Sequence, residues 1–246
     1  MTADAEKIKK KKKKRSPAMV AAIVLVVLLI VLMLTLAFLT SFDEVTNVFD
    51  SGRVDIILTE ENWKPEKAHN IVPETVLDKD PKITNNEHNA VYVFLEVKVP
   101  YDNMVIEGNT DADKGSVVAN GTNPVPMYKF IDENDHMDST LTTAQNINSG
   151  WMLLGTPEQN TTDKTYTYLY AHVREDQTNK LSPLGGGVTT GKALFNKIKL
   201  VNFNESYYST RDYSVRVKAY GIQANFLMPD NQTTDDPQQV WNILNS

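Results

Sequence analysis

Residues 90–99 read Ala-Val-Tyr-Val-Phe-Leu-Glu-Val-Lys-Val, and this stretch decides the fold class of the chain. Its aliphatic residues occupy every second position, at Val91, Val93, Leu95, Val97 and Val99. The positions between them hold Tyr92, Phe94, Glu96 and Lys98. A period of two is typical of a β-strand, because successive side chains of a strand point to opposite faces. Proline has no N–H to donate to a ladder, so we expect Pro100 to end this strand.

Other segments of the chain repeat the alternation. They cover residues 54–59, 166–173, 194–203 and 213–226. Several amphipathic strands imply two packed sheets, so the predicted class is all-β and antiparallel, in one domain. Stretches rich in Asn, Asp, Gly, Thr and Pro, at residues 101–126 and 181–191, are expected to be loops.

The C-terminus predicts one short helix that packs against the sandwich. Asp236 suits the N-cap position, and Pro237 suits the first helical position because its missing N–H would be unpaired there anyway. Val240, Trp241 and Leu244 follow at helical spacing and form an apolar stripe.

Charge is divided unevenly along the chain. Residues 1–37 carry eight of the 25 Lys and Arg residues and two of the 31 Asp and Glu residues, a net charge of +6. The remaining 17 basic and 29 acidic residues give the body a net charge of −12. A body this acidic repels nucleic acid, so we expect no nucleic-acid partner. Cysteine is absent, which rules out disulfides and thiolate ligands and favours a bacterial over a eukaryotic exported protein.

The N-terminus predicts export. Lys7 and residues 9–15 form a basic region, and residues 18–39 contain no charged side chain. Such a segment enters a membrane, either as a signal peptide or as an uncleaved anchor. Thr35 and Ala37 place small residues at positions −3 and −1 of a signal-peptidase site. We therefore divide the chain into a signal or anchor, residues 1–37, and an extracytoplasmic domain, residues 38–246, that is secreted or held at the cell surface.

No catalytic constellation is apparent in the sequence. The four histidines, His69, His88, His136 and His172, lack the H-E-x-x-H spacing that holds zinc on one helical face. His172 alternates with Tyr166, Tyr168 and Tyr170, which indicates a residue on a strand face among aromatic rings. The serines have no nucleophile-elbow context. The predictions are therefore that the protein is not an enzyme and needs no cofactor.

Two polar segments have the oxygen-rich character that calcium prefers. The first is residues 109–115, where the glycine is one place late for an EF-hand loop, and the second contains Asp132, Asn134, Asp135 and Asp138. Solvated acidic loops are the favoured interpretation of both, with calcium as the alternative. The glycine-rich stretch 185–190 lacks the Lys-Ser/Thr of a phosphate loop, so we interpret it as a structural turn.

The order of segments resembles the TasA and camelysin family of exported Gram-positive proteins. The resemblance begins at residues 35–60 and is most specific in two adjoining segments, 77–86 and 90–99, with later matches at Gly150-Trp151, 166–170, 193–195 and 217–224. It implies a jelly-roll-like β-sandwich, a dedicated signal peptidase, and assembly into matrix or surface fibres. The Arg usual in the family's central strand is replaced around Phe94, and residues 101–149 look expanded.

The resemblance also motivates a hypothesis for assembly. We expect the processed N-terminus, which carries Phe38, Phe42, Val45 and Val48, to insert as a donor strand into the next copy or into a related matrix subunit. The alternative function is a surface-anchored adhesin or binding module. A third is a metalloprotease, because camelysins carry that label.

Overall fold

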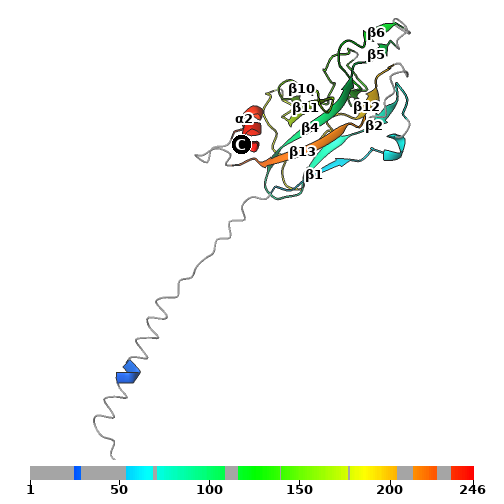
Figure 1. Cartoon of the computed structure of the whole chain (residues 1–246). Coiled ribbons are helices and arrows are strands. Elements are labelled where there is room, and N and C mark those ends of the chain that lie inside the picture. The colour runs from blue at the N-terminus through cyan, green and yellow to red at the C-terminus, as the bar shows by residue number, and fades with distance from the viewer. Residues whose placement is uncertain are drawn as a thin grey trace, which may run out of the picture. The chain divides into compact units, whose positions relative to one another are not determined.

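A computed structural model describes residues 25–28, 54–68, 71–108, 116–138, 140–176, 178–203, 213–225 and 234–246 (Figure 1). The chain divides into two compact units, Met1–Phe49 and Asp50–Ser246. In the first unit only residues 25–28 are described, and they are helical and exposed. None of the helices that the structure describes combines the length and apolarity needed to cross a membrane. Thr35, Ala37 and the expected donor strand 38–48 lie outside the described residues, as does the polar segment 109–115.

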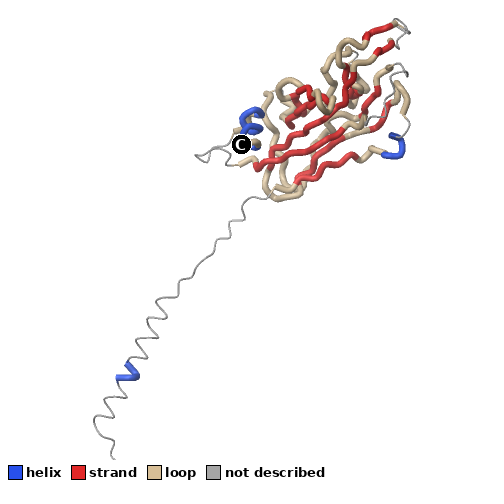
Figure 2. Tube along the Cα trace, viewed as in Figure 1, coloured by secondary structure: helices blue, strands red, loops and turns tan. Residues whose placement is uncertain are grey.

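The second unit is built mainly of antiparallel strands, as predicted (Figure 2). The described strands are β1 (Ile56–Glu60), β2 (Val76–Asp78), β3 (Pro81–Asn85), β4 (Val91–Asp102), β5 (Val105–Glu107), β6 (Val117–Asn120), β7 (Val125–Pro126), β8 (Tyr128–Ile131), β9 (Trp151–Leu153), β10 (Glu158–Asn160), β11 (Thr165–His172), β12 (Lys197–Leu200) and β13 (Arg216–Gln223). The helical elements of this unit are the 3-10 helix η1 (Pro65–Ala68) and the helix α2 (Pro237–Leu244).

The main sheet has the strand order β10-β11-β4-β13, so β4 lies in its interior. β9 also pairs with β11, and β7 also pairs with β4. A second sheet has the order β2-β12-β8, and two further pairs are β1-β3 and the hairpin β5-β6. The register between β4 and β13 runs from Lys98↔Arg216 to Val91↔Gln223. Pairing between strands remote in sequence therefore builds the main sheet.

One core lies between the main sheet and the second sheet. The aliphatic residues that alternate along β4 are all 0% exposed and belong to this core. Ile198 of β12 and Phe130 of β8 belong to the same cluster. Phe130 connects the two sheets, because its ring lies 6.0 Å from that of Tyr168 on β11 and stacks at 4.1 Å on Phe195. The predicted packing of two sheets is thus present.

The opposite face of the main sheet is covered by the C-terminal helix. Tyr92 and Phe94 of β4 form a second buried cluster with Val240 and half-buried Trp241 of α2. The Asp236 side chain accepts a hydrogen bond from the Gln239 N–H at 3.0 Å, and this caps the first turn. The predicted helix and its cap are confirmed, and the helix packs against the main sheet.

The prediction that Pro100 ends the central strand is wrong. β4 continues to Asp102 and pairs Pro100 with Thr165 of β11. The Tyr101 N–H bonds to the Lys164 carbonyl at 3.0 Å, so the nitrogen of Pro100 faces away from β11. On that side the pairing with β13 extends only as far as Lys98, which lies opposite Arg216. The Pro100 carbonyl instead accepts from the Met127 N–H at 2.8 Å. Proline therefore occupies the position at which β4 changes neighbours, where no N–H is required.

The expectation that residues 101–126 form a loop is wrong in part. This region contains the hairpin β5-β6 and the short strand β7. The region shows no clear alternation, because β5 buries only Ile106 over its three residues and β6 is largely exposed and needs no apolar face. The expected loop at 181–191 is confirmed, although Leu181, Leu184 and Thr189 each form a single bridge to a neighbouring segment.

Candidate functional site

The main sheet has one long open edge, and it is formed by β13. Among the strands that the structure describes, β13 pairs with β4 alone, whereas three-residue strands border the opposite edge of the sheet. The Ala224 N–H bonds to the Ala90 carbonyl at 2.8 Å. Counting back from Ala224, every second residue of β13 therefore directs its backbone N–H and C=O groups toward β4. The N–H and C=O groups of Val217, Ala219 and Gly221 consequently point away from β4.

These outward-pointing groups have no hydrogen-bond partner within the described residues. An unpaired row of backbone donors and acceptors can accept another strand. Proteins commonly blunt such an edge with short strands or charges, and the charged residues of β13, Arg216 and Lys218, are exposed near one end of the strand. The remainder of β13 is half-buried and mostly apolar, so the edge is open over most of its length.

Half-buried apolar side chains lie beside this edge. Val217 and Ala219 of β13 pack against the main core without being buried by it, and so do Val54, Ile56 and Leu58 at the start of the domain. We call these five residues the edge groove. A β-carbon added at Gly221 would lie only 3.1–3.2 Å from the side chains of Val54 and Ile56. The glycine thus lets the first strand approach β13 closely.

The other face of β13 is polar near its N-terminal half. The Tyr220 hydroxyl donates to the Glu96 carboxylate at 3.1 Å, and the Lys218 ammonium lies 4.4 Å from the centre of the Tyr220 ring. Lys98 lies 3.8 Å from Glu96. A strand added at this edge would therefore meet apolar side chains on the groove side and polar side chains on the other side.

The described histidines do not converge on one site. His69 lies outside the described residues, and the described chain brings together no group of three or more His, Asp or Glu side chains that could hold a metal ion. His172 lies on β11 with its ring 5.2 Å from that of Trp151, so its predicted place among aromatic residues on a strand face is confirmed. Its Nδ1 lies 3.2 Å from the Ser182 carbonyl oxygen.

Interpretation of the second polar segment as a solvated loop is wrong for Asp132. This side chain is buried and accepts from the N–H groups of Asn134 at 2.8 Å and His136 at 2.9 Å. Burial opposes its ionisation, but these backbone hydrogen bonds and the His136 side chain together outweigh burial, and the pKa of Asp132 is lowered. Asp135 instead pairs with Lys197 at 2.6 Å, and Asp138 accepts from the Thr140 hydroxyl. The carboxylates shape the turn separately rather than forming one ligand set.

The glycine-rich stretch is a tight turn against the end of β3. The Val188 N–H bonds to the Gly185 carbonyl at 3.2 Å, and the Gly187 N–H bonds to the Asn85 carbonyl. A β-carbon at Gly186 would lie 2.6 Å from the Glu87 carbonyl oxygen, so only glycine fits there. This close approach of backbone to backbone accounts for the glycine at position 186, and no phosphate-binding role is needed to explain it.

The geometry defines a mostly β, antiparallel domain with an open sheet edge. Comparison with protein-family models, curated proteins and solved structures found no match to this chain. The resemblance drawn from the sequence therefore stays a prediction. The sequence identified β13 as a strand but not as an edge, because edge position depends on pairing between remote segments.

Proposed function

We propose that this protein is an exported structural subunit that assembles into extracellular or biofilm-matrix fibres. In this proposal, residues 38–48 of one copy add as a strand to the edge of β13 in the next copy. The observation that carries it is the long open edge of β13 beside the half-buried edge groove. Strand addition satisfies the free backbone groups and buries alternate side chains at the same time.

The donor segment has the length and pattern that the edge requires. β13 has eight residues and so spans about 26 Å at 3.3 Å per residue. Residues 38–48 are sufficient to match it in extended form. Phe38, Phe42 and Val48 have the same parity and would share one face of the strand. Each such side chain contributes about 1.5–3 kcal/mol when fully buried, against the entropy cost of ordering the segment.

Export and processing complete the proposal. Insertion of residues 18–39 into the membrane directs the domain outward, and a signal peptidase cuts after Ala37 to release Phe38. Donor and acceptor surfaces differ, so the contact is head-to-tail and growth need not close into a ring. If the N-terminus is retained, the rival proposal of a surface-anchored adhesin applies. N-terminal sequencing of protein from medium and from cells separates the two.

Removing the donor segment should abolish fibre growth. A chain that starts at Phe38 is expected to form fibres at rising concentration in electron micrographs, and the same chain without residues 38–47 is expected to stay a folded monomer. The physical reason is loss of both the added strand and its apolar side chains. Circular dichroism and sedimentation check folding and mass. Fibres of unchanged morphology from the shortened chain would show that the contact lies elsewhere.

Blocking the acceptor edge should weaken assembly without removing the donor. Ala219→Pro deletes one outward N–H of β13, and its loss is expected to raise the critical concentration for fibres about tenfold, the effect of roughly 1.4 kcal/mol. The matched control is Gln159→Pro, which deletes an outward N–H on the opposite edge at β10. Equal effects of the two prolines, at similar melting temperatures, would contradict assignment of the acceptor edge to β13.

A further inference from the structure

A polar cleft of about 360 Å³ lies between the end of β11 and the loop 182–192. Its polar and aromatic walls include Ser149, Trp151, His172, Glu175, Ser182 and Lys192, and apolar residues such as Val188 also line it. The cleft shares no residue with β13 or the edge groove. None of these residues has a role in the assembly proposed above, so the cleft can be considered by itself.

One side of the cleft presents hydrogen-bond donors. The Lys192 ammonium is held by the Glu133 carboxylate at 2.5 Å and by the Ser149 hydroxyl oxygen at 2.7 Å. An ammonium has three protons, so one remains for a ligand. Because the Ser149 hydroxyl accepts from Lys192, its own proton is also available.

The other side presents acceptors. The Ser182 carbonyl can only accept, so the neutral His172 ring carries its proton on Nδ1 and leaves Nε2 as an acceptor. Burial lowers the pKa of His172, which favours this neutral form at pH 7. The Glu175 carboxylate makes no hydrogen bond or ion pair to the described part of the chain. An Oε1 atom of Glu175 lies 3.5 Å from where a β-carbon of Gly150 would be, at the wall of the cleft.

Trp151 fixes the two sides relative to each other. The residue is 6% exposed, so it is a wall of the cleft and not an open stacking surface. The indole N–H donates to the Lys192 carbonyl at 3.2 Å, and the indole ring makes a T-shaped contact with the His172 ring. The donor side and the acceptor side are thus tied to one rigid side chain.

We propose that this cleft binds a neutral saccharide unit. A ligand here must accept from an ammonium and a hydroxyl while donating to an imidazole nitrogen and a carboxylate. Hydroxyl groups do both, and a sugar ring carries several of them at fixed spacing. An anion would meet Glu175 and a cation would meet Lys192, so neither charge is matched. The volume is at the lower end of the range for small-molecule sites and suits one or two sugar rings.

Titration of simple glycosides tests the proposal. The probes are the methyl glycosides of glucose, galactose, mannose and N-acetylglucosamine, added to the full chain in a detergent without a sugar headgroup. Calorimetry and saturation-transfer NMR are expected to show a dissociation constant of about 1 mM for at least one glycoside. Glu175→Gln should weaken glycoside binding about tenfold, because a hydrogen bond to a charged acceptor becomes one to a neutral amide.

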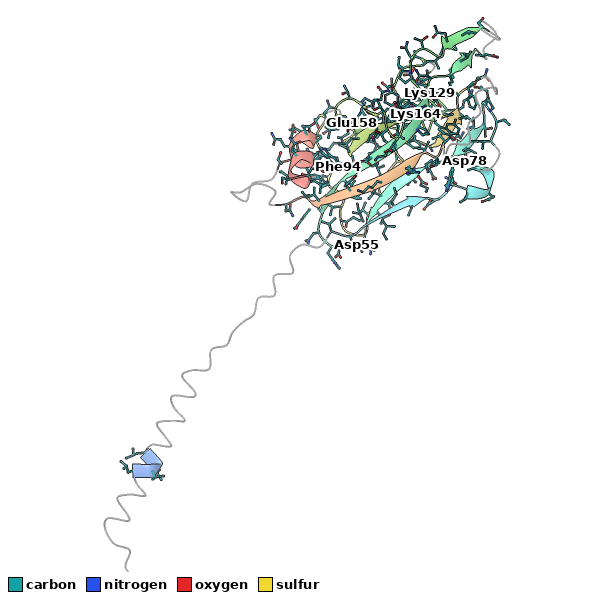
Figure 3. All side chains as sticks on the ribbon, in the orientation of Figure 1. Asp55, Asp78, Phe94, Lys129, Glu158 and Lys164 are labelled. Carbon is teal, nitrogen blue, oxygen red and sulfur yellow. The ribbon has the colours of Figure 1, made fainter. Side chains whose placement is uncertain are left out.

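Matched variants make the result decisive. Glu158→Gln changes an exposed carboxylate on β10 (Figure 3) that does not line the cleft, and it should leave glycoside binding unchanged. Ser149→Ala is the second cleft variant if Glu175→Gln fails to fold, and it should also weaken binding because it removes the donor hydroxyl beside Lys192. The proposal is overturned if no glycoside binds, if Glu175→Gln and Glu158→Gln bind alike, or if inorganic phosphate binds more tightly than every glycoside. None of these results depends on fibre formation.

Discussion

Phe94→Ala is expected to lower the free energy of unfolding by about 3–5 kcal/mol, the range for removing a fully buried aromatic side chain. Phe94 is 0% exposed and lies beside the C-terminal helix, with its ring 5.3 Å from that of Trp241 (Figure 3). The substitution removes transfer free energy and leaves a cavity between β4 and α2. Urea unfolding followed by circular dichroism measures the change.

The same variant should release the helix locally before the sheet unfolds. α2 has eight residues, too few to be stable without packing, and its buried contacts are to the face that carries Phe94. Hydrogen exchange should therefore accelerate in Val240 and its neighbours and much less in β4. Val72→Ala, at a side chain that is 58% exposed, is the control and should cost under about 0.5 kcal/mol.

The expected coupling between Phe94 and Trp241 can be measured directly. If the two rings stabilise each other, Phe94→Ala combined with Trp241→Ala should cost less than the two single changes added together. A cost below about 1 kcal/mol for Phe94→Ala, or strict additivity of the pair, would show that the second buried cluster does not attach the helix.

Lys129 is expected to make the protein more stable as the pH rises above 8. Its side chain is 3% exposed, and its ammonium donates to the Thr142 carbonyl at 2.7 Å and the Ala144 carbonyl at 3.3 Å. Burial lowers the pKa of Lys129 to about 8, and the nearby negative charge of Asp138 opposes the shift. The ordinary pKa of lysine is 10.5.

Stability rises with pH here because the folded protein binds the Lys129 proton more weakly than the unfolded chain does. Between pH 8 and 10.5 the unfolded chain holds the Lys129 proton and the folded protein has released it, so raising the pH favours the folded protein. Below pH 8 both states are protonated, and the full cost of burying the charge is present. The lowered pKa of Lys129 corresponds to roughly 3 kcal/mol of unfolding free energy, and the two hydrogen bonds to carbonyls, which favour the ammonium, make the real gain in stability smaller.

Comparison of variants isolates this contribution from other titrating groups. Lys129→Met should remove the rise in stability that comes from deprotonating Lys129. Between pH 8 and 10.5 the wild type should therefore become more stable relative to the variant by roughly 1–3 kcal/mol. Urea midpoints at several pH values provide the measurement. Lys64→Met, at an exposed lysine, is the matched control and should follow the wild-type profile. Parallel profiles for wild type and Lys129→Met would contradict the effect.

Local patterns in the sequence predicted those elements whose stability depends on nearby residues. The alternation over residues 90–99 predicted β4 because both faces of this strand are buried by apolar layers. Asp236 and Pro237 predicted the start of α2 because capping involves backbone groups only three residues away. The charge division and the absence of cysteine are likewise properties of composition alone.

Tertiary structure decided which strand is interior and which is an edge. Pro100 reads as a terminator, yet it continues β4 because β13 ends just before it and β7 begins just after it. The same pairing leaves β13 open on one side. Backbone contacts of β3 and β4 with the loop 182–192 bring Lys192 to the same cleft as Glu175. These outcomes depend on hydrogen bonds between segments up to more than a hundred residues apart, which no local period encodes. Local sequence determined the strands and the helix, and remote pairing determined the edge and the cleft.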